Sequence, residues 1–314
     1  MDAGLKFKMG PGEWVLLLAL SLLWGGAFFC NTIAVNSLGV FTVVAGRIGL
    51  GALALWAVLR LRGEPLPARP GQWAAFYVMG LLNNLLPFSL IVWGQSHVSA
   101  GLAATLNATT PLFTVLLAHF LTRDEKLNPA KLTGALAGAA GVAILMGPGL
   151  VRGDAVSLLA CGAVLAAACS YALAGIFGRR LRSASPLGNA AGQLIASASI
   201  MLPLALALER PWLGTAPPWQ AWLAVAYLGF AGTALAYAIY FTVLARAGAT
   251  NLLLVTLLIP VSALLLDLTL LGQVPGPAHL AGMAVIAAAL LAIDGRLPAA
   301  GVRLFKGGRK GRTT

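Results

Sequence analysis

The sequence contains few charged residues. Of its 314 residues, 10% are Asp, Glu, Lys or Arg, whereas 59% are hydrophobic and the mean hydropathy is +0.88. Soluble globular domains contain roughly 25% charged residues. The composition therefore excludes a soluble globular domain and indicates an integral membrane protein, in which lipid covers most of the apolar surface.

The sequence also lacks the motifs of several enzyme classes. It contains no G-x-x-x-x-G-K-[ST] phosphate loop, no H-E-x-x-H and no G-x-S-x-G, and no paired carboxylates lie within an apolar segment. Its three cysteines, Cys30, Cys161 and Cys169, all fall inside apolar segments and are expected to be small buried hydrophobes. We therefore expect no enzyme activity, no cofactor and no metal ion, and ATP-driven transport would need a partner subunit.

Apolar segments of about 20 residues, long enough to cross a bilayer, occur ten times. They cover residues 14–34, 40–59, 73–93, 98–121, 130–147, 155–178, 186–208, 219–245, 250–271 and 278–293. The first segment is too long for the apolar region of a signal peptide, and no A-x-A-like site follows it, so we expect it to be retained. The sequence thus predicts an all-α membrane protein with ten transmembrane helices.

The basic residues are distributed very unevenly over the loops. Of the 21 Lys and Arg residues, eighteen lie in tails and alternate loops on one side, Arg152 and Arg210 lie on the other, and Arg47 lies within the second span. This pattern reflects topology rather than a nucleic-acid surface, so no nucleic-acid partner is expected. By the positive-inside rule the tails, residues 1–13 and 294–314, are predicted to be cytoplasmic.

An internal repeat divides the chain into two halves of five spans, residues 14–147 and 155–293. An offset of 149 residues aligns Gly80 with Gly229, Ala100 with Ala249 and Pro111 with Pro260. A repeat with an odd number of spans must be inverted, and inverted repeats are typical of alternating-access transporters. The alternative, a coincidental likeness among ten unrelated helices, stays open.

Four stretches carry a resemblance to a known family. They are L-L-A-L-S-L-L-W-G-G-A-F from Leu17, A-A-T-L-N-A-T-T-P-L-F-T from Ala103, R-D-E-K-L from Arg123 and R-A-G-A-T-N-L-L-L-V-T-L-L-I-P-V from Arg246. With Arg47 in the second span, they resemble the drug/metabolite transporter superfamily, in particular its EamA-type members with ten helices. The resemblance covers nearly the whole chain. One departure is Gln273, where the family usually has Glu after a glycine, which puts a role for an acid there in doubt.

The resemblance has implications for function. Within the superfamily the chain is similar to amino-acid exporters, the aromatic amino-acid exporters among them. The direction of transport, export, rests on this resemblance alone. So does the location, a multi-pass protein of a bacterial inner membrane.

The fourth span contains hydrogen-bonding side chains and a proline. A proline in a helix interior leaves the carbonyl four residues earlier without a donor, which for Pro111 is that of Asn107. Pro260, preceded by Thr256, repeats the arrangement in the second half, so both prolines are candidate hinges. Asn107 and Thr256 are candidates for a substrate cavity, but interhelical hydrogen bonding would explain them as well.

The third and eighth spans supply the other candidate cavity residues. A buried amide must find partners, so at least one of two adjacent asparagines should point into the protein. Aromatic side chains nearby would form the walls of a cavity, although core packing or an interfacial belt would also account for them. The candidates are Asn83, Asn84, Phe88, Thr233, Tyr237, Tyr240 and, from the first span, Trp24.

The ionisable residues inside the spans narrow the class of solute. Arg47 is the only cation there, which disfavours phosphorylated substrates, and Asp267 is the only acid. Asp267 lies near the outer end of its span, where snorkelling to the interface and coupling to an ion are both open. Small neutral or zwitterionic solutes remain.

The sequence thus predicts a secondary transporter that exports amino acids or similar metabolites by alternating access. The alternatives are a multidrug exporter and a membrane receptor or scaffold without net flux. The expected partners are a small-molecule substrate and membrane lipid. Gly134, Gly138 and Gly141 form a small-residue face that a dimer could use, but we expect its use within a monomer.

Overall fold

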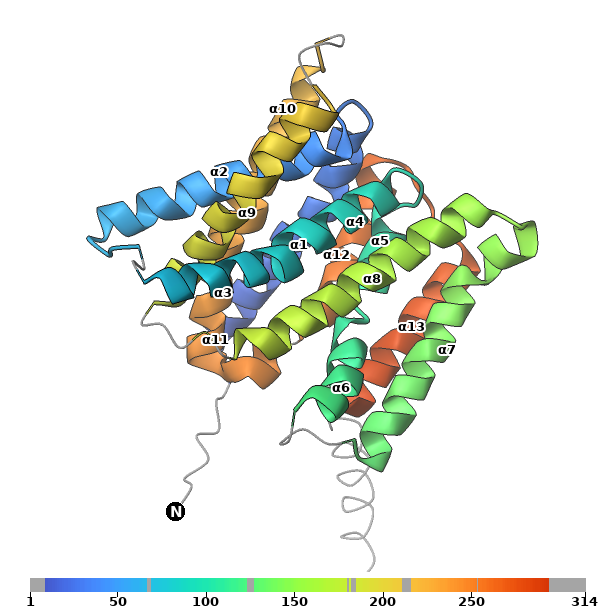
Figure 1. Cartoon of the computed structure of the whole chain (residues 1–314). Coiled ribbons are helices and arrows are strands. Elements are labelled where there is room, and N and C mark those ends of the chain that lie inside the picture. Colours follow the sequence, from blue (N-terminus) through green and yellow to red (C-terminus); the bar gives the residue numbers. More distant parts are fainter. Residues whose placement is uncertain are drawn as a thin grey trace, which may run out of the picture.

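The computed structural model describes residues 9–66, 69–122, 127–179, 181, 185–210, 216–252 and 254–293. Every regular element within these ranges is a helix, so the all-α prediction is confirmed for them (Figure 1). Most of the two tails predicted to be cytoplasmic, residues 1–8 and 294–314, lies outside the described residues.

The helices follow one another along the chain with short connections. They are α1 (Pro11–Val35), α2 (Val40–Leu61), α3 (Pro70–Gly80), the π-helix η1 (Leu81–Leu85), α4 (Leu86–Gln95), α5 (Ala100–Asn107), α6 (Thr110–Leu121), α7 (Pro129–Arg152), α8 (Ala155–Gly178), α9 (Pro186–Leu208), α10 (Trp219–Gly229), the π-helix η2 (Phe230–Leu235), α11 (Ala236–Leu252), α12 (Val255–Leu270) and α13 (Pro277–Ile293).

Local sequence explains where many of these helices begin. Pro11, Pro70 and Pro129 each lie in a first turn, where the missing N–H is not needed. The side chains of Asp154 and Ser185 accept hydrogen bonds from backbone amides in the first turns of α8 and α9. Such signals mark the starts of the predicted spans to within a few residues.

Eight helical segments are long and apolar enough to cross a membrane, and they match the first eight predicted spans. The ninth and tenth correspond to the shorter apolar helices α12, of 16 residues, and α13, of 17 residues. At about 1.5 Å per residue these two helices are shorter than the roughly 30 Å hydrocarbon core. Ahead of α12, the chain is non-helical at Gly248 (φ 77°, ψ 167°), where the connection between the eighth and ninth predicted spans lies.

Two π-helical segments interrupt the third and eighth spans, and their first residues are 149 positions apart. Gly80 precedes η1 and Gly229 precedes η2. A Cβ on Gly80 would lie 3.0 Å from the carbonyl oxygen of Gln193, and a Cβ on Gly229 would lie 2.5 Å from Leu50 Cβ. The glycines thus let α3 approach α9 and α10 approach α2 closely.

Several helix contacts made by one half recur as equivalent contacts made by the other half. α1 packs against α10, α11 and α12, while α8 packs against α3, α4, α5 and α6. α2 packs against α10 and α9 against α3, and the pairs α2·α9 and α7·α13 join the halves. These contacts are preserved when α1 is exchanged with α8, α2 with α9, α3–α4 with α10–α11, α5–α6 with α12, and α7 with α13.

The loops meet at two opposite ends of the helices. Glu209, after α9, accepts hydrogen bonds from the backbone N–H groups of Phe41 (2.8 Å) and Thr42 (2.7 Å), which begin α2. At the other end the Ser185 hydroxyl donates to Glu64 (2.7 Å), which joins the connections after α2 and α8. Connections that the alternating topology places on the same side therefore contact one another.

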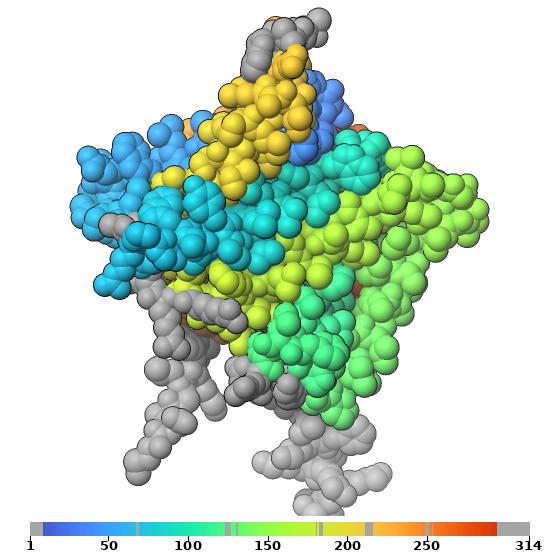
Figure 2. All heavy atoms as spheres, viewed as in Figure 1, coloured from blue at the N-terminus to red at the C-terminus, as the bar shows by residue number. Residues whose placement is uncertain are grey.

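Large apolar side chains cover the outside of the bundle. Leu159 of α8 is 65% exposed and Leu136 of α7 is 64% exposed. Figure 2 shows α3, α4, α8, α7 and α6 side by side on one such face. Exposed apolar surface of this extent is typical of a lipid-facing protein.

The small-residue face of α7 is used within the chain. A Cβ on Gly134 would lie 3.0 Å from the carbonyl oxygen of Ala289, and a Cβ on Gly141 would lie 3.1 Å from that of Gly282. Both contacts are with α13, and Gly138 faces Leu112 of α6. The glycines therefore allow α7 and α13 to pack closely.

Candidate functional site

Arg47 lies at the meeting point of the two halves. Its side chain is 8% exposed, and its Nε donates a hydrogen bond to the Thr233 hydroxyl (3.2 Å) in η2. Its Cζ lies 3.8 Å from the centroid of the Phe88 ring, a cation–π contact with α4. Arg47 thus connects α2, the third span and the eighth span.

Asn83 makes the corresponding connection from the first half. Its Nδ2 lies within hydrogen-bonding distance of Gln193 Oε1 on α9 (3.2 Å) and of the Tyr237 hydroxyl on α11 (3.3 Å). We call Arg47, Asn83, Phe88, Gln193, Thr233 and Tyr237 the central cluster. Four of these six, Asn83, Phe88, Thr233 and Tyr237, are candidates that the sequence predicted.

A hydrogen bond joins each π-helix to a helix of the opposite half. Arg47 of α2 donates to Thr233 in η2, and Asn83 in η1 donates to Gln193 of α9. A π-helix contains i→i+5 hydrogen bonds and locally widens the helix, and such segments are frequent at functional sites. The two π-helices therefore each present a polar side chain to the opposite half.

Asn84 is connected to the cluster indirectly, through Ser197. It is fully buried, and its Nδ2 donates to the Ser197 hydroxyl (3.1 Å) on α9. Ser197 in turn donates to the Gln193 carbonyl oxygen (2.6 Å). Both asparagines of the pair therefore point into the protein, but Asn84 serves as an interhelical contact.

Trp24 and Tyr240 form an aromatic pair at 5.8 Å between ring centroids. Phe241 contacts both Tyr240 (5.3 Å) and Tyr237 (6.3 Å), so it links this pair to the central cluster. Tyr237, Phe241, Tyr240 and Trp24 therefore form a chain of ring contacts, with Trp24 and Tyr240 at its edge.

The remaining polar candidates lie apart. Asn107 is on α5 and Thr256 is on α12. The Oδ1 of Asn107 is enclosed without a hydrogen-bond partner. The structure therefore gives the Asn107 side chain no direct role in the cluster.

The expectation that Pro111 interrupts a helix interior was wrong. The fourth span breaks between α5 and α6, and Pro111 lies in the first turn of α6, where no donor is needed. The Asn107 carbonyl oxygen accepts a hydrogen bond from the Thr110 hydroxyl (2.7 Å). Pro260, by contrast, lies inside the continuous helix α12, so the two prolines differ in their local structure.

Asp267 does not snorkel, because it is 1% exposed. Its Oδ2 accepts a hydrogen bond from the Gly101 backbone N–H (2.7 Å) at the start of α5, and its Oδ1 is enclosed without a partner. Thr105 donates to the Gly101 carbonyl oxygen (2.7 Å) and lies 3.2 Å from His279 Nε2. His279 also lines a hollow of about 430 Å³ between α7, α8 and α13.

Sequence reasoning did not assign Arg47, Gln193 or Tyr171 to the site. Tyr171 of α8 and Tyr237 of α11 pack against the buried core that contains Phe88. The signal that could have found Arg47 was its position as the one cation inside a predicted span. Gln193 and Tyr171 carry no such signal.

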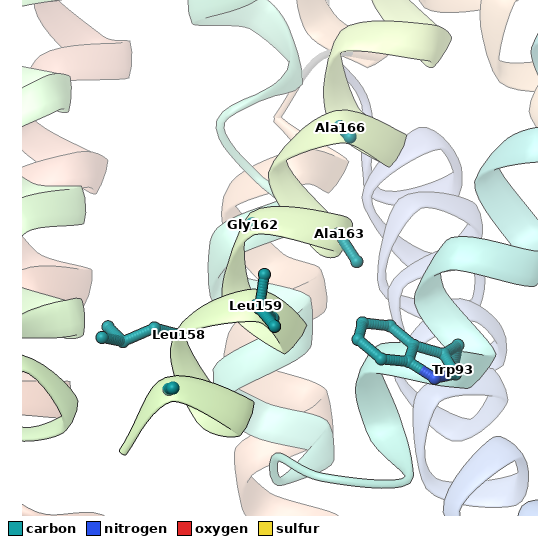
Figure 3. A pocket seen from close by; sticks show the side chains of 7 residues that line it. Trp93, Leu158, Leu159, Gly162, Ala163 and Ala166 are labelled. Carbon is teal, nitrogen blue, oxygen red and sulfur yellow. The ribbon is translucent and has the colours of Figure 1, made fainter. Parts of the chain in front are cut away.

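A second hollow, of about 680 Å³, lies on the outer surface between α4 and α8 (Figure 3). Trp93 faces Leu159, Gly162, Ala163 and Ala166 across it. Its lining is almost wholly apolar, and Leu159 is largely exposed. This groove fits a lipid-facing surface rather than a site for a polar solute.

Comparison with known proteins places these features in a family. The model of the EamA-like transporter family matches residues 12–147 and again residues 158–293. The transporter YoaV of Bacillus subtilis (strain 168) is 23% identical over 253 residues, which are 79% of this chain and 85% of YoaV. The inner membrane transporter YedA of Escherichia coli (strain K12) is 29% identical over 227 residues, 71% of each chain.

Two further likenesses cover more of the chain. The "Probable terminal-alkyne amino-acid exporter" of Streptantibioticus cattleyicolor is 28% identical over 300 residues, 92% of this chain and 95% of that one. One solved crystal structure has the same fold, with a TM-score of 0.64, 22% identity, and coverage of 90% of this chain and 96% of the other. The helices that span a membrane, the polar cluster at the meeting point of the two matched segments and these similarities agree: the chain is a multi-pass membrane protein that belongs to the EamA-like transporter family of the drug/metabolite transporter superfamily.

Proposed function

We propose that this protein is a secondary transporter that exports amino acids, or similar small neutral or zwitterionic metabolites, by alternating access. Its family consists of transporters, and a relative that aligns with nearly the whole chain is named as an amino-acid exporter. YedA, named as an inner membrane transporter, supports a location in a bacterial inner membrane. We take the chain to act as a monomer with both termini in the cytoplasm.

The proposal includes ten spans arranged as two inverted repeats. The two segments that match the family model, the two π-helices 149 residues apart and the exchangeable helix packing all support it. Because each repeat has five spans, the second enters the membrane from the opposite side. The two halves can then rock against each other around a fixed site.

The observation that carries the proposal is a pair of hydrogen bonds that join the two halves. Arg47 of the second span contacts Thr233 in the eighth, and Gln193 of the seventh contacts Asn83 in the third. Substrate sites of inverted-repeat transporters lie between the repeats and are built where helices depart from regular geometry. The central cluster meets both conditions.

The two alternatives are supported less well. An exporter of lipophilic cations needs a buried acid at its site, and no carboxylate in the described part of the chain forms an ion pair with Arg47. A receptor or scaffold does not need matching polar contacts from both halves. Asp267, enclosed against α5, is our candidate for coupling to an ion.

Counterflow in proteoliposomes tests the proposal. Liposomes loaded with an unlabelled amino acid should accumulate the same labelled amino acid, tested for each of the common amino acids with and without a pH gradient. Arg60→Gln, at the exposed end of α2, serves as a control for handling and reconstitution. Absence of counterflow for every amino acid, in protein that reconstitutes as a folded monodisperse species, would contradict the proposal.

A further inference from the structure

We propose that the Arg47 guanidinium binds a carboxylate group of the transported solute, so that the substrates are amino acids or similar zwitterionic metabolites that carry a carboxylate. This inference rests on the proposed transport function and narrows its substrate class. It assigns to Arg47 a role that neither the family match nor the names of the relatives give. Three features of the site support this role: an unpaired charge, an open edge of the guanidinium, and neighbours that suit the rest of an amino acid.

The first feature is the unpaired charge of Arg47. A buried ion is strongly disfavoured unless an opposite charge or hydrogen bonds compensate it. Arg47 is 8% exposed, yet within the described residues its one hydrogen bond is from Nε to Thr233 (3.2 Å), and no carboxylate pairs with it. The site therefore holds a cation whose partner is not provided by these residues.

The second feature is the geometry of the Arg47 guanidinium. The Nε of Arg47 donates to the Thr233 hydroxyl, and the Phe88 ring covers one face of the guanidinium at 3.8 Å. The edge formed by Nη1 and Nη2 has no hydrogen-bond partner among the described residues. This edge can bind a carboxylate with two parallel hydrogen bonds. Among the described residues, the enclosed polar atoms without partners are on Asn31, Asn84, Asn107 and Asp267, and the Arg47 nitrogens are not among them. The Nη atoms are therefore not fully enclosed, and a water molecule can touch this edge.

The third feature is the set of polar and aromatic side chains around Arg47. The hydroxyl of Tyr237 lies 3.3 Å from Asn83 Nδ2, and if its oxygen accepts there its hydrogen stays available for a carboxylate. The Asn83 Oδ1 has no hydrogen-bond donor among the described residues and is not enclosed, so it can accept a hydrogen bond from an ammonium group. Tyr171 and Tyr237 pack against the buried core that contains Phe88, the ring that covers the guanidinium. The cluster thus matches both ends of an amino acid.

The charge of the site also separates this class of solute from the others. A lipophilic cation would be repelled by an unpaired guanidinium. A phosphate ester would bring about two negative charges to a site with a single cation inside the spans. A single carboxylate carries one negative charge, which matches the one positive charge of Arg47.

The test compares each acid with its uncharged analogue. Binding to the purified protein is measured calorimetrically for glycine, leucine, phenylalanine and tryptophan, and for the amide and the decarboxylated amine of each. At least one amino acid should bind, and its amide and amine should bind at least about tenfold more weakly, the loss typical of a charge-assisted hydrogen bond. In Arg47→Gln this preference for the acid should disappear.

Two variants keep the result interpretable. Arg60→Gln removes a guanidinium from the same helix, where it lies over Trp56 (5.8 Å) at the exposed end, and should keep the preference. Arg47→Lys keeps the charge but not the two parallel donors, so it should retain part of the preference even if Arg47→Gln does not fold.

Every other result counts against the inference. It is overturned if the amides bind as well as the acids, if Arg47→Gln or Arg47→Lys keeps the full preference, or if no acid of the series binds. Counterflow of the amides or amines would leave transport standing and refute the role of Arg47. Preferential binding of an acid without any counterflow would leave the role of Arg47 standing and refute transport.

Discussion

Replacing Asp267 tests whether the buried carboxylate is a structural contact, a coupling group or both. Its Oδ2 accepts a hydrogen bond from the Gly101 N–H at 2.7 Å, and the side chain is 1% exposed. A hydrogen bond to a charged group contributes about 1.5–3 kcal/mol, and an unpaired buried N–H costs about 1–3 kcal/mol. Asp267→Ala should therefore lower the free energy of unfolding by about 2–3 kcal/mol. Asp267→Asn keeps an oxygen acceptor and should lower it by less than about 1 kcal/mol.

Unfolding in detergent, followed by denaturant titration, measures these differences. Asp154→Ala is a matched control, because Asp154 also accepts a backbone hydrogen bond, from Ser157 N–H (3.0 Å), but at an exposed helix start. It should cost about 1 kcal/mol. An Asp267→Ala variant as stable as the wild type would refute the reasoning that this contact holds α5 against α12.

The same variants separate coupling from structure. If Asp267 carries a proton during transport, Asp267→Asn should abolish uptake driven by a pH gradient and leave counterflow intact, because exchange needs only the substrate site. Unchanged gradient-driven uptake in this variant would leave Asp267 as a structural contact alone.

Two further predictions concern helix bending and helix packing. Pro111→Ala and Pro260→Ala should each fold, slow counterflow and bias the protein toward opposite-facing states, with the larger effect at Pro260 because it lies inside α12. Spin-label distances across the two rims measure the bias, and wild-type rates and distances in both variants would make the prolines tolerated kinks. Gly141→Leu should destabilise the protein by about 1–3 kcal/mol or more, because even a Cβ at this position would lie 2.7 Å from Ile286 Cγ1. At Gly147 a Cβ would have no atom within 4 Å, so Gly147→Leu should be near neutral. Denaturant titration of both variants, with equal losses as the contradicting result, checks the packing.

The sequence predicted the apolar helices well because lipid imposes one simple requirement, a long apolar helix. The first eight predicted spans coincide with long apolar helices, and the ninth and tenth with shorter ones. Apolar content does not reveal how a helix is hydrogen-bonded, so η1, η2 and the break between α5 and α6 were not predicted. The break is why Pro111 begins a helix instead of interrupting one.

The candidate site was predicted in part for a similar reason. Local composition singled out Asn83, Phe88, Thr233 and Tyr237 as polar or aromatic groups inside spans, and the structure brings them together. The contact between Arg47 and Thr233 joins residues 186 positions apart, and it depends on how the two halves pack. No local pattern contains that information.

The central claim is that one site between the two halves is reached in turn from either side of the membrane. The most direct measurement labels Asn83→Cys, in a background without Cys30, Cys161 and Cys169, with a membrane-impermeant thiol reagent added to one side of oriented vesicles at a time. Asn31→Cys is the control, since Asn31 is 1% exposed and bonded to Gln95 (2.9 Å). The account predicts that Asn83→Cys is labelled from both sides, that a transported amino acid protects it from both, and that Asn31→Cys is labelled from neither. Labelling of Asn83→Cys from a single side only, under conditions in which counterflow proceeds, would contradict it.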